Sequence, residues 1–356
     1  MKNNFFLKFT FLITGLLGLI RCISNQDSES KKSALSGNNG ADYFQITDSI
    51  ILYKGEEIVV ADKASFVVLS ENYAKDAKMA YYCTESRNSQ DYYTTKSRQI
   101  IYLKSADPTS FQLVGDQYSG VAKDKNQAYV DGVSFPITDY ETFEIVDTKI
   151  TKDRLHVYFK FNKVSGADAP TFQNIDQNFY LDKQMAYFLD GTDLKAFHCN
   201  SASFLPLSYP FSKDDKQVFY KEKPISGVKI VSFEILGNSY SKDSDHVYFE
   251  NQLVQNASPK DFSLVPGYEN TTTVMKYGRD KQFVYHETNK LVGRDPASFV
   301  ILDLGYTKDA SNVYFNNSKV QNADPETFEV FPHQVGDRDA KDKNHVFLKG
   351  KALSKN

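Results

Sequence analysis

The sequence predicts an all-β fold, built as a tandem array of repeats of about 29 residues. A phrase close to Lys-Asp-x-x-x-Val-Tyr-Phe returns nine times between Asp76 and Asp342. Each copy is preceded by a second phrase, Thr/Ser-Phe-x-x-Leu. The step from Phe to Asp is 10 residues in six copies, and the step from Asp to the next Phe is 19 in six of eight cases. A fixed period indicates one supersecondary unit repeated in space.

Each unit carries an aspartate and, five positions later, an aromatic residue. The aspartates are Asp76, Asp124, Asp153, Asp182, Asp214, Asp243, Asp280, Asp309 and Asp342, and the aromatic residues are Tyr81, Tyr129, Tyr158, Tyr187, Phe219, Tyr248, Tyr285, Tyr314 and Phe347. Asp favours turns because its side chain bonds nearby backbone N–H groups. An aromatic residue in every unit is typical of a core position, although exposed tyrosines could also stack on sugars or peptides. We therefore interpret both series as structural anchors of the repeat.

The remaining positions predict the other elements of the unit. Four residues before each anchor phenylalanine lies Asp, Asn or Ser in eight of nine units, and Pro follows it directly in four. This pattern indicates a capped single turn of helix. An apolar residue three positions after the Phe enters a short strand, and the Val-Tyr-Phe run after the Asp forms another. A polar turn such as Asp131-Gly132 then leads to a return strand, so about three short strands are expected per unit.

We expect an elongated stack of these units. The alternative is a closed, propeller-like ring, but a 29-residue unit is shorter than a usual propeller blade of about 40 residues. The array is expected to span residues 43–356. Exceptions to the period are insertions, such as Glu85–Arg98 and Glu269–Val274, and insertions in arrays map to loops.

Two copies of the phrase resemble a known family. Asp-Lys-Asn-Gln-Ala-Tyr at Asp124–Tyr129 and Asp-Lys-Asn-His-Val-Phe at Asp342–Phe347 are similar to the signature of the DKNYY repeat family of bacterial proteins. The resemblance covers roughly residues 60–350. Asp153–Tyr158 keeps only the aspartate and the aromatic residue, and most copies depart from the literal letters. The resemblance implies a bacterial protein, with export or lipoprotein signals in many members. It implies no catalytic residues, because no activity is established for the family.

The N-terminus is organised differently from the array. Residues 1–22 read as a signal peptide, with Lys2 and Lys8 near an apolar run, Phe9–Ile20, that is short for a membrane span. Leu19-Ile20-Arg21-Cys22 is similar to a lipobox, which predicts lipidation of Cys22, although Arg21 stands where a small residue is expected. Cleavage after Ser24 is the alternative. Residues 23–42 are polar and predict a flexible tether.

Composition argues against several classes of function. The net charge is −3 with lysines and acids interspersed, so no basic stripe indicates nucleic-acid binding. The chain has no Gly-rich phosphate loop and no Gly-x-Ser-x-Gly elbow, and we expect no cofactor. Three cysteines are too few for a disulfide scaffold, and a Cys83–Cys199 bridge would require distant repeats to touch.

The sequence also gives little support for a metal site. His156, His246 and His345 follow their anchor aspartates by three residues, but several units separate them, so we interpret them as turn residues. His198 lies next to Cys199, and no second Cys/His pair accompanies it. Alternate acids occur at 243/245 and 337/339, where capping of the turn is favoured over calcium binding.

Three functional hypotheses follow. The favoured one is a non-catalytic repeat protein of the bacterial cell envelope, exported, anchored by a lipid on Cys22 and presenting a binding surface to protein or glycan. The second is a structural spacer lipoprotein without a ligand. The third is an enzyme, a hydrolase with a site at an insertion such as Glu85–Arg98. A soluble exported protein is the alternative to the membrane anchor.

Overall fold

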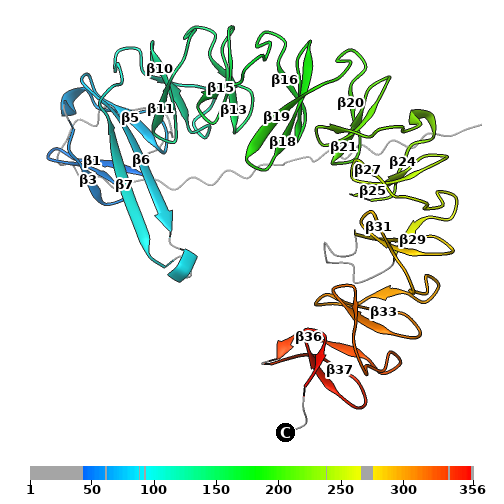
Figure 1. Cartoon of the computed structure of the whole chain (residues 1–356). Coiled ribbons are helices and arrows are strands. Elements are labelled where there is room, and N and C mark those ends of the chain that lie inside the picture. The colour runs from blue at the N-terminus through cyan, green and yellow to red at the C-terminus, as the bar shows by residue number, and fades with distance from the viewer. Residues whose placement is uncertain are drawn as a thin grey trace, which may run out of the picture. The chain divides into compact units, whose positions relative to one another are not determined.

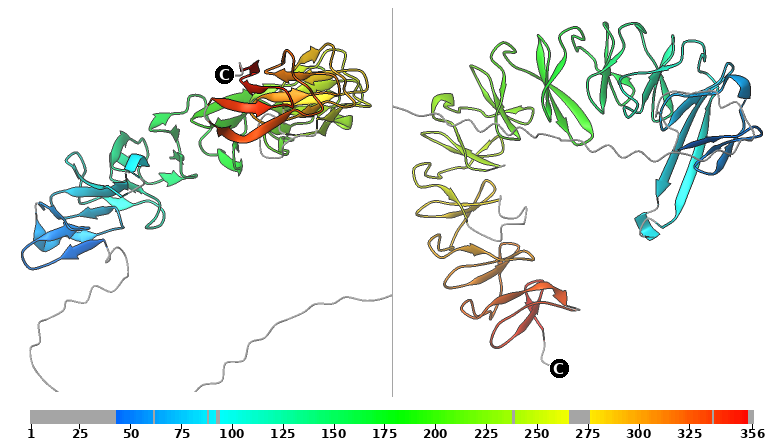
Figure 2. Two further views of the ribbon diagram at one scale, coloured as in Figure 1. Left: turned by 90° about the horizontal axis from the view of Figure 1, so that it is seen from below. Right: turned by 180° about the vertical axis from the view of Figure 1, so that it is seen from behind.

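The computed structural model of the protein describes residues 43–353, apart from 61, 88, 92–93, 238, 266–275 and 336. In this part of the chain the structure is all-β, and its strands form small antiparallel sheets that follow one another in chain order (Figure 1). Two further views show the sheets as separate units along the chain (Figure 2). The predicted signal peptide, Cys22 and the tether lie outside the described residues.

Ten sheets are described, the first with three strands and the rest with four. The first comprises β1 (Phe44–Ile46), β2 (Ile51–Tyr53) and β3 (Glu56–Ile58). The next three are β4 (Val67–Val68), β5 (Tyr73–Lys75), β6 (Ala80–Arg87), β7 (Lys96–Leu103); β8 (Gln112–Leu113), β9 (Val121–Lys123), β10 (Gln127–Val130), β11 (Val133–Pro136); and β12 (Glu144–Ile145), β13 (Ile150–Lys152), β14 (Val157–Phe159), β15 (Asn162–Lys163).

The central sheets repeat the same order of strands. They are β16 (Gln173–Asp176), β17 (Phe179–Leu181), β18 (Met185–Asp190), β19 (Asp193–His198); β20 (Leu205–Pro206), β21 (Phe211–Lys213), β22 (Val218–Tyr220), β23 (Lys223–Pro224); and β24 (Glu234–Ile235), β25 (Tyr240–Lys242), β26 (Val247–Phe249), β27 (Gln252–Leu253). In every four-stranded sheet each strand pairs with its neighbour in sequence, which makes the sheet a simple meander.

Three further sheets complete the described array. They are β28 (Ser263–Leu264), β29 (Tyr277–Arg279), β30 (Val284–His286), β31 (Asn289–Leu291); β32 (Val300–Ile301), β33 (Tyr306–Lys308), β34 (Val313–Phe315), β35 (Ser318–Lys319); and β36 (Glu329–Val335), β37 (Arg338–Lys341), β38 (Val346–Leu348), β39 (Lys351–Ala352). Each of the nine units that carry the anchor aspartate therefore has four strands, where the sequence analysis expected about three. The missed strand is the short one directly before the anchor aspartate, such as β5.

The capped turns before the anchor phenylalanines are short. Two of them are 3₁₀ helices, η1 (Lys63–Ser65) and η3 (Ile230–Ser232), and a third 3₁₀ helix, η2 (Ser89–Asp91), lies in the insertion between β6 and β7. At η1 the Asp62 side chain accepts a hydrogen bond from the Ala64 N–H at 3.2 Å, as an N-cap residue does. The turn delivers the following phenylalanine into the core.

The core lies between consecutive sheets. Between the second and third sheets, Tyr73 and Tyr82 pack with Phe111, Ala122 and Tyr129. The described residues form nine such clusters, each joining one sheet to the next in chain order, and none joins the first sheet to the last. No described strand pairs with a strand of another sheet, so the sheets form a series and not a closed barrel.

A second aromatic position, three residues before the anchor aspartate, connects neighbouring units. Tyr73 packs on Phe111 of the next unit, with ring centroids 5.9 Å apart. The Tyr73 hydroxyl donates to the Gly120 carbonyl at 3.2 Å and accepts from the Gly132 N–H at 3.1 Å. Both glycines belong to the next sheet and have positive φ angles of 65° and 76°. The sequence analysis did not identify this position.

The first sheet is a unit without the aspartate. Phe44 pairs with Tyr53 across β1 and β2 as Tyr73 pairs with Tyr82 across β5 and β6. Thr47 then stands where the aspartate would be, and its Oγ1 accepts a hydrogen bond from the Ile50 N–H at 3.0 Å. The array of units therefore begins one sheet earlier than the nine aspartates indicate.

Candidate functional site

The aspartate-centred turn is the most regular polar feature of the array. In the unit of Asp243, Oδ1 accepts hydrogen bonds from the backbone N–H groups of Asp245 and His246, both at 2.8 Å. Oδ2 accepts from the Lys229 N–H at 2.7 Å and from the Tyr248 hydroxyl at 3.0 Å. One carboxylate thus joins its own hairpin turn, the preceding capped turn and the core tyrosine.

The same arrangement recurs along the chain. In all nine units Oδ1 accepts from the N–H groups two and three residues later. In all nine, Oδ2 accepts from the N–H of the residue that precedes the capped turn. Seven units add a tyrosine hydroxyl, whereas Phe219 and Phe347 have none to donate. The structure places all nine aromatic residues in the core.

These hydrogen bonds determine the charge state of the aspartate. Burial raises the pKa of Asp243, but the bonds from Lys229, Asp245, His246 and Tyr248 outweigh it and leave the pKa below its ordinary value. The pKa values of four other anchors are lowered by the same balance: Asp76, Asp153, Asp280 and Asp342. A carboxylate whose oxygens accept several bonds stays ionised, so it acts here as a structural acceptor.

In five units the basic residue before the aspartate bonds to the capped turn of the next unit. Lys123 Nζ donates to the backbone carbonyls of Tyr140 and Phe143, at 2.7 and 3.3 Å, in the next capped turn. Lys75, Lys152 and Lys308 each bond two carbonyls at the equivalent place. These bonds supply donors to carbonyls that a one-turn element leaves unpaired.

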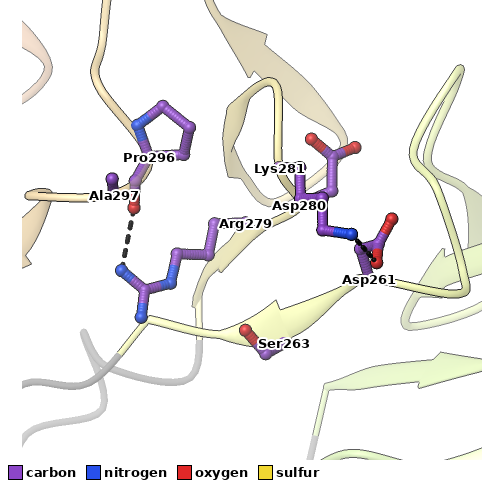
Figure 3. Close-up of a pocket in the computed structure, with 7 residues that line it drawn as sticks. All are labelled: Asp261, Ser263, Arg279, Asp280, Lys281, Pro296 and Ala297. Carbon is purple, nitrogen blue, oxygen red and sulfur yellow. Dashed lines mark hydrogen bonds and ion pairs between the residues drawn. The ribbon is translucent and has the colours of Figure 1, made fainter.

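Grooves lie at two equivalent junctions beside these basic residues. The Lys152 groove has a volume of about 440 Å³ and is lined by Glu141, Thr142, Phe143, Glu144, Lys152, Asp153, Arg154, Ala169 and Pro170. The Arg279 groove has a volume of about 330 Å³ and is lined by Asp261, Ser263, Arg279, Asp280, Lys281, Pro296 and Ala297 (Figure 3). Each groove combines the turn and first strands of one unit with the capped turn of the next. The side chains at matching positions differ, so the scaffold repeats and its surface chemistry does not.

The histidines singled out in the sequence lie beside anchor aspartates. The Nδ1 atoms of His156, His246 and His345 are 3.8, 3.8 and 3.5 Å from Oδ1 of the aspartate three residues earlier. His198 is exposed at the end of β19. Cys83 is buried and Cys199 is half-buried, and neither forms a disulfide. Among the residues that the structure describes, no three His, Cys, Asp or Glu side chains converge as metal ligands would.

Three of the four alternate acids bond to partners within the protein. Asp245 forms an ion pair with the Lys229 side chain, next to the backbone bonds of Asp243. Asp339 accepts from the Tyr306 hydroxyl at 2.8 Å and from the Lys349 N–H at 2.6 Å. The oxygens thus bond groups of the protein. Within the described ranges, no helix is long and apolar enough to cross a bilayer.

Comparisons with known proteins agree with the repeat. The sequence profile of the DKNYY family matches residues 43–191 and 211–351, which together make up most of the chain. The first match begins at the aspartate-free first sheet. A search of curated proteins and a search of solved structures found no match.

Proposed function

Because the chain belongs to the DKNYY family, whose profile covers residues 43–191 and 211–351, we propose that it is a non-catalytic binding protein of the bacterial cell envelope. The array presents a surface for protein or glycan at the end of a polar tether. A lipid on Cys22 anchors the tether to the membrane. One observation carries the binding role: the recurring polar groups point inward to hold the units together, while the side chains lining the two grooves differ.

The non-catalytic part of the proposal rests on how the acids are used. The anchor aspartates accept hydrogen bonds from their own turns. At the insertion between β6 and β7, where a hydrolase site is the competing hypothesis, Glu85 forms ion pairs with Arg98 at 3.2 Å and with Lys54 at 3.9 Å. Those ion pairs hold the hairpin to its own sheet and to the first sheet. A spacer without a ligand remains the main alternative.

Binding to isolated cell envelopes tests the proposal. The full-length protein carrying Cys22→Ala, labelled with a fluorophore, is titrated onto envelopes of the producing bacterium, so that lipid insertion cannot contribute. A binding protein is expected to saturate and to be displaced by an excess of the unlabelled protein. A spacer is expected to adsorb weakly and in proportion to its concentration, and that result would refute the proposed function.

A further inference from the structure

Arg279 differs from its counterparts in neighbouring units. Lysine occupies this position in seven of nine units, and a lysine ammonium carries three donors. Lys75, Lys123, Lys152 and Lys308 each use two of them on carbonyls of the next capped turn. A guanidinium has five N–H donors, and among the described residues Arg279 uses one, from Nη1 to the Pro296 carbonyl at 2.8 Å.

Three of the nine units place a glutamate opposite the residue before the aspartate, and the unit of Arg279 does not. Arg279 pairs with Ser263 across β28 and β29, at the register position where Glu144 pairs with Lys152. In the Lys152 groove, Glu144 lies 3.4 Å from the ammonium and compensates its charge. Glutamate also pairs with lysine at 234/242 and at 329/341, at 3.5 and 3.3 Å. Serine provides no such compensation at Arg279.

The acids of the Arg279 groove bond to groups other than the guanidinium. Asp261 pairs with the Lys281 ammonium at 2.9 Å. Asp280 accepts from the Ser258, Gln282 and Phe283 N–H groups and from the Tyr285 hydroxyl. No described carboxylate forms an ion pair with Arg279, whose guanidinium lies between Pro296 and Ser263 (Figure 3). Within the described residues, the half-buried guanidinium therefore keeps N–H donors that no carboxylate occupies.

We propose that the Arg279 groove binds a carboxylate borne by an acidic glycan, an inference that rests on the proposed binding function. A guanidinium with free N–H groups grips a carboxylate through two parallel hydrogen bonds. The carboxylates of Asp261 and Asp280 in the groove repel a doubly charged phosphate more strongly than a singly charged carboxylate. The volume of about 330 Å³ is that of a small-ligand site. The Ser263 hydroxyl and the Lys281–Asp261 pair can bond sugar hydroxyls, while only Pro296 and Ala297 are apolar.

Two variants test the site without altering the fold, because each residue occurs at the equivalent position of other units. Arg279→Lys keeps the positive charge but removes the pair of parallel N–H donors. Ser263→Glu places a carboxylate opposite the guanidinium. Val300→Glu makes the same change opposite Lys308 in the next unit and is the matched control. Calorimetric titration of the full-length protein with trigalacturonate is expected to show binding that both groove variants weaken about tenfold or more, and that the control leaves unchanged.

The choice of probes distinguishes the sources of the anion. The methyl ester of trigalacturonate is expected not to bind, and inorganic phosphate and a tri-aspartate peptide are expected to bind more weakly. If trigalacturonate binds wild type and both groove variants with equal affinity, or if its methyl ester binds as tightly, the proposed site is wrong. Tighter binding of phosphate or of the peptide would overturn its assignment to an acidic glycan. If trigalacturonate fails to bind while cell envelopes still bind saturably, this inference falls and the proposed function stands.

Discussion

Replacing Asp243 with alanine is expected to lower the free energy of unfolding by about 3–5 kcal/mol. The substitution leaves three backbone N–H groups and the Tyr248 hydroxyl without their acceptor, in a turn where the carboxylate is buried. Each buried donor that loses its partner costs about 1–3 kcal/mol, less where water can reach it. Urea denaturation followed by circular dichroism measures the change.

Tyr248→Phe is the matched control for this variant. It removes one of the four donors and keeps the ring, and Phe219 and Phe347 already occupy the equivalent position in two units. The expected loss is about 1 kcal/mol. If the alanine variant at Asp243 loses no more than the phenylalanine variant, the carboxylate does not hold the turns together and the structural role assigned to it is wrong.

Acid is expected to destabilise the array because protonation removes the charge of anchor aspartates that hold the turns together. Hydrogen bonds lower the pKa values of five of them in the folded state: Asp76, Asp153, Asp243, Asp280 and Asp342. A carboxylate with a lowered folded pKa contributes stability that is fully present above its unfolded pKa of about 3.9, and that is lost as the pH falls through the folded value. We expect the urea midpoint to change little from pH 7 to 5 and to fall steeply below about pH 4.

The Asp243→Asn variant is the control for the acid response. It keeps the shape of the side chain and removes one titrating anchor, so its midpoint is expected to start lower at pH 7 and to fall less between pH 5 and 3. High salt is expected to leave the acid transition in place, because the buried bonds are weakly screened. A wild-type midpoint that is unchanged at pH 3 would contradict the role of the aspartates.

The architecture of the array was largely predictable from local patterns. An aspartate, an aromatic residue five positions later and a capped phenylalanine recur with a fixed spacing, and the turn and core positions follow from that recurrence. The strand before the aspartate, such as Tyr73–Lys75, was missed because three residues carry little periodic signal. The tyrosine at its start could have been found, because an aromatic residue stands at that position in six units.

The first sheet and the grooves were harder to predict for physical reasons. Thr47 replaces the aspartate in the first sheet, so a search for the charged anchor passes over a turn that a hydroxyl also stabilises. The pairing of Ser263 with Arg279 spans 16 residues, where Glu144 and Lys152 are eight apart, because an insertion intervenes. That Arg279 faces Ser263 and not a glutamate is visible only once the register of the sheet is known.

The mass of the mature N-terminal peptide from the producing bacterium tests most directly whether the array is displayed on a lipid tether. The account predicts a peptide that begins at Cys22 and carries two or three acyl chains, and Cys22→Ala is expected to abolish this species. A mature protein that begins at Asn25 would contradict the membrane anchor and leave a soluble exported protein. An intact Met1 would contradict export by signal cleavage and with it the proposed place of the protein on the envelope.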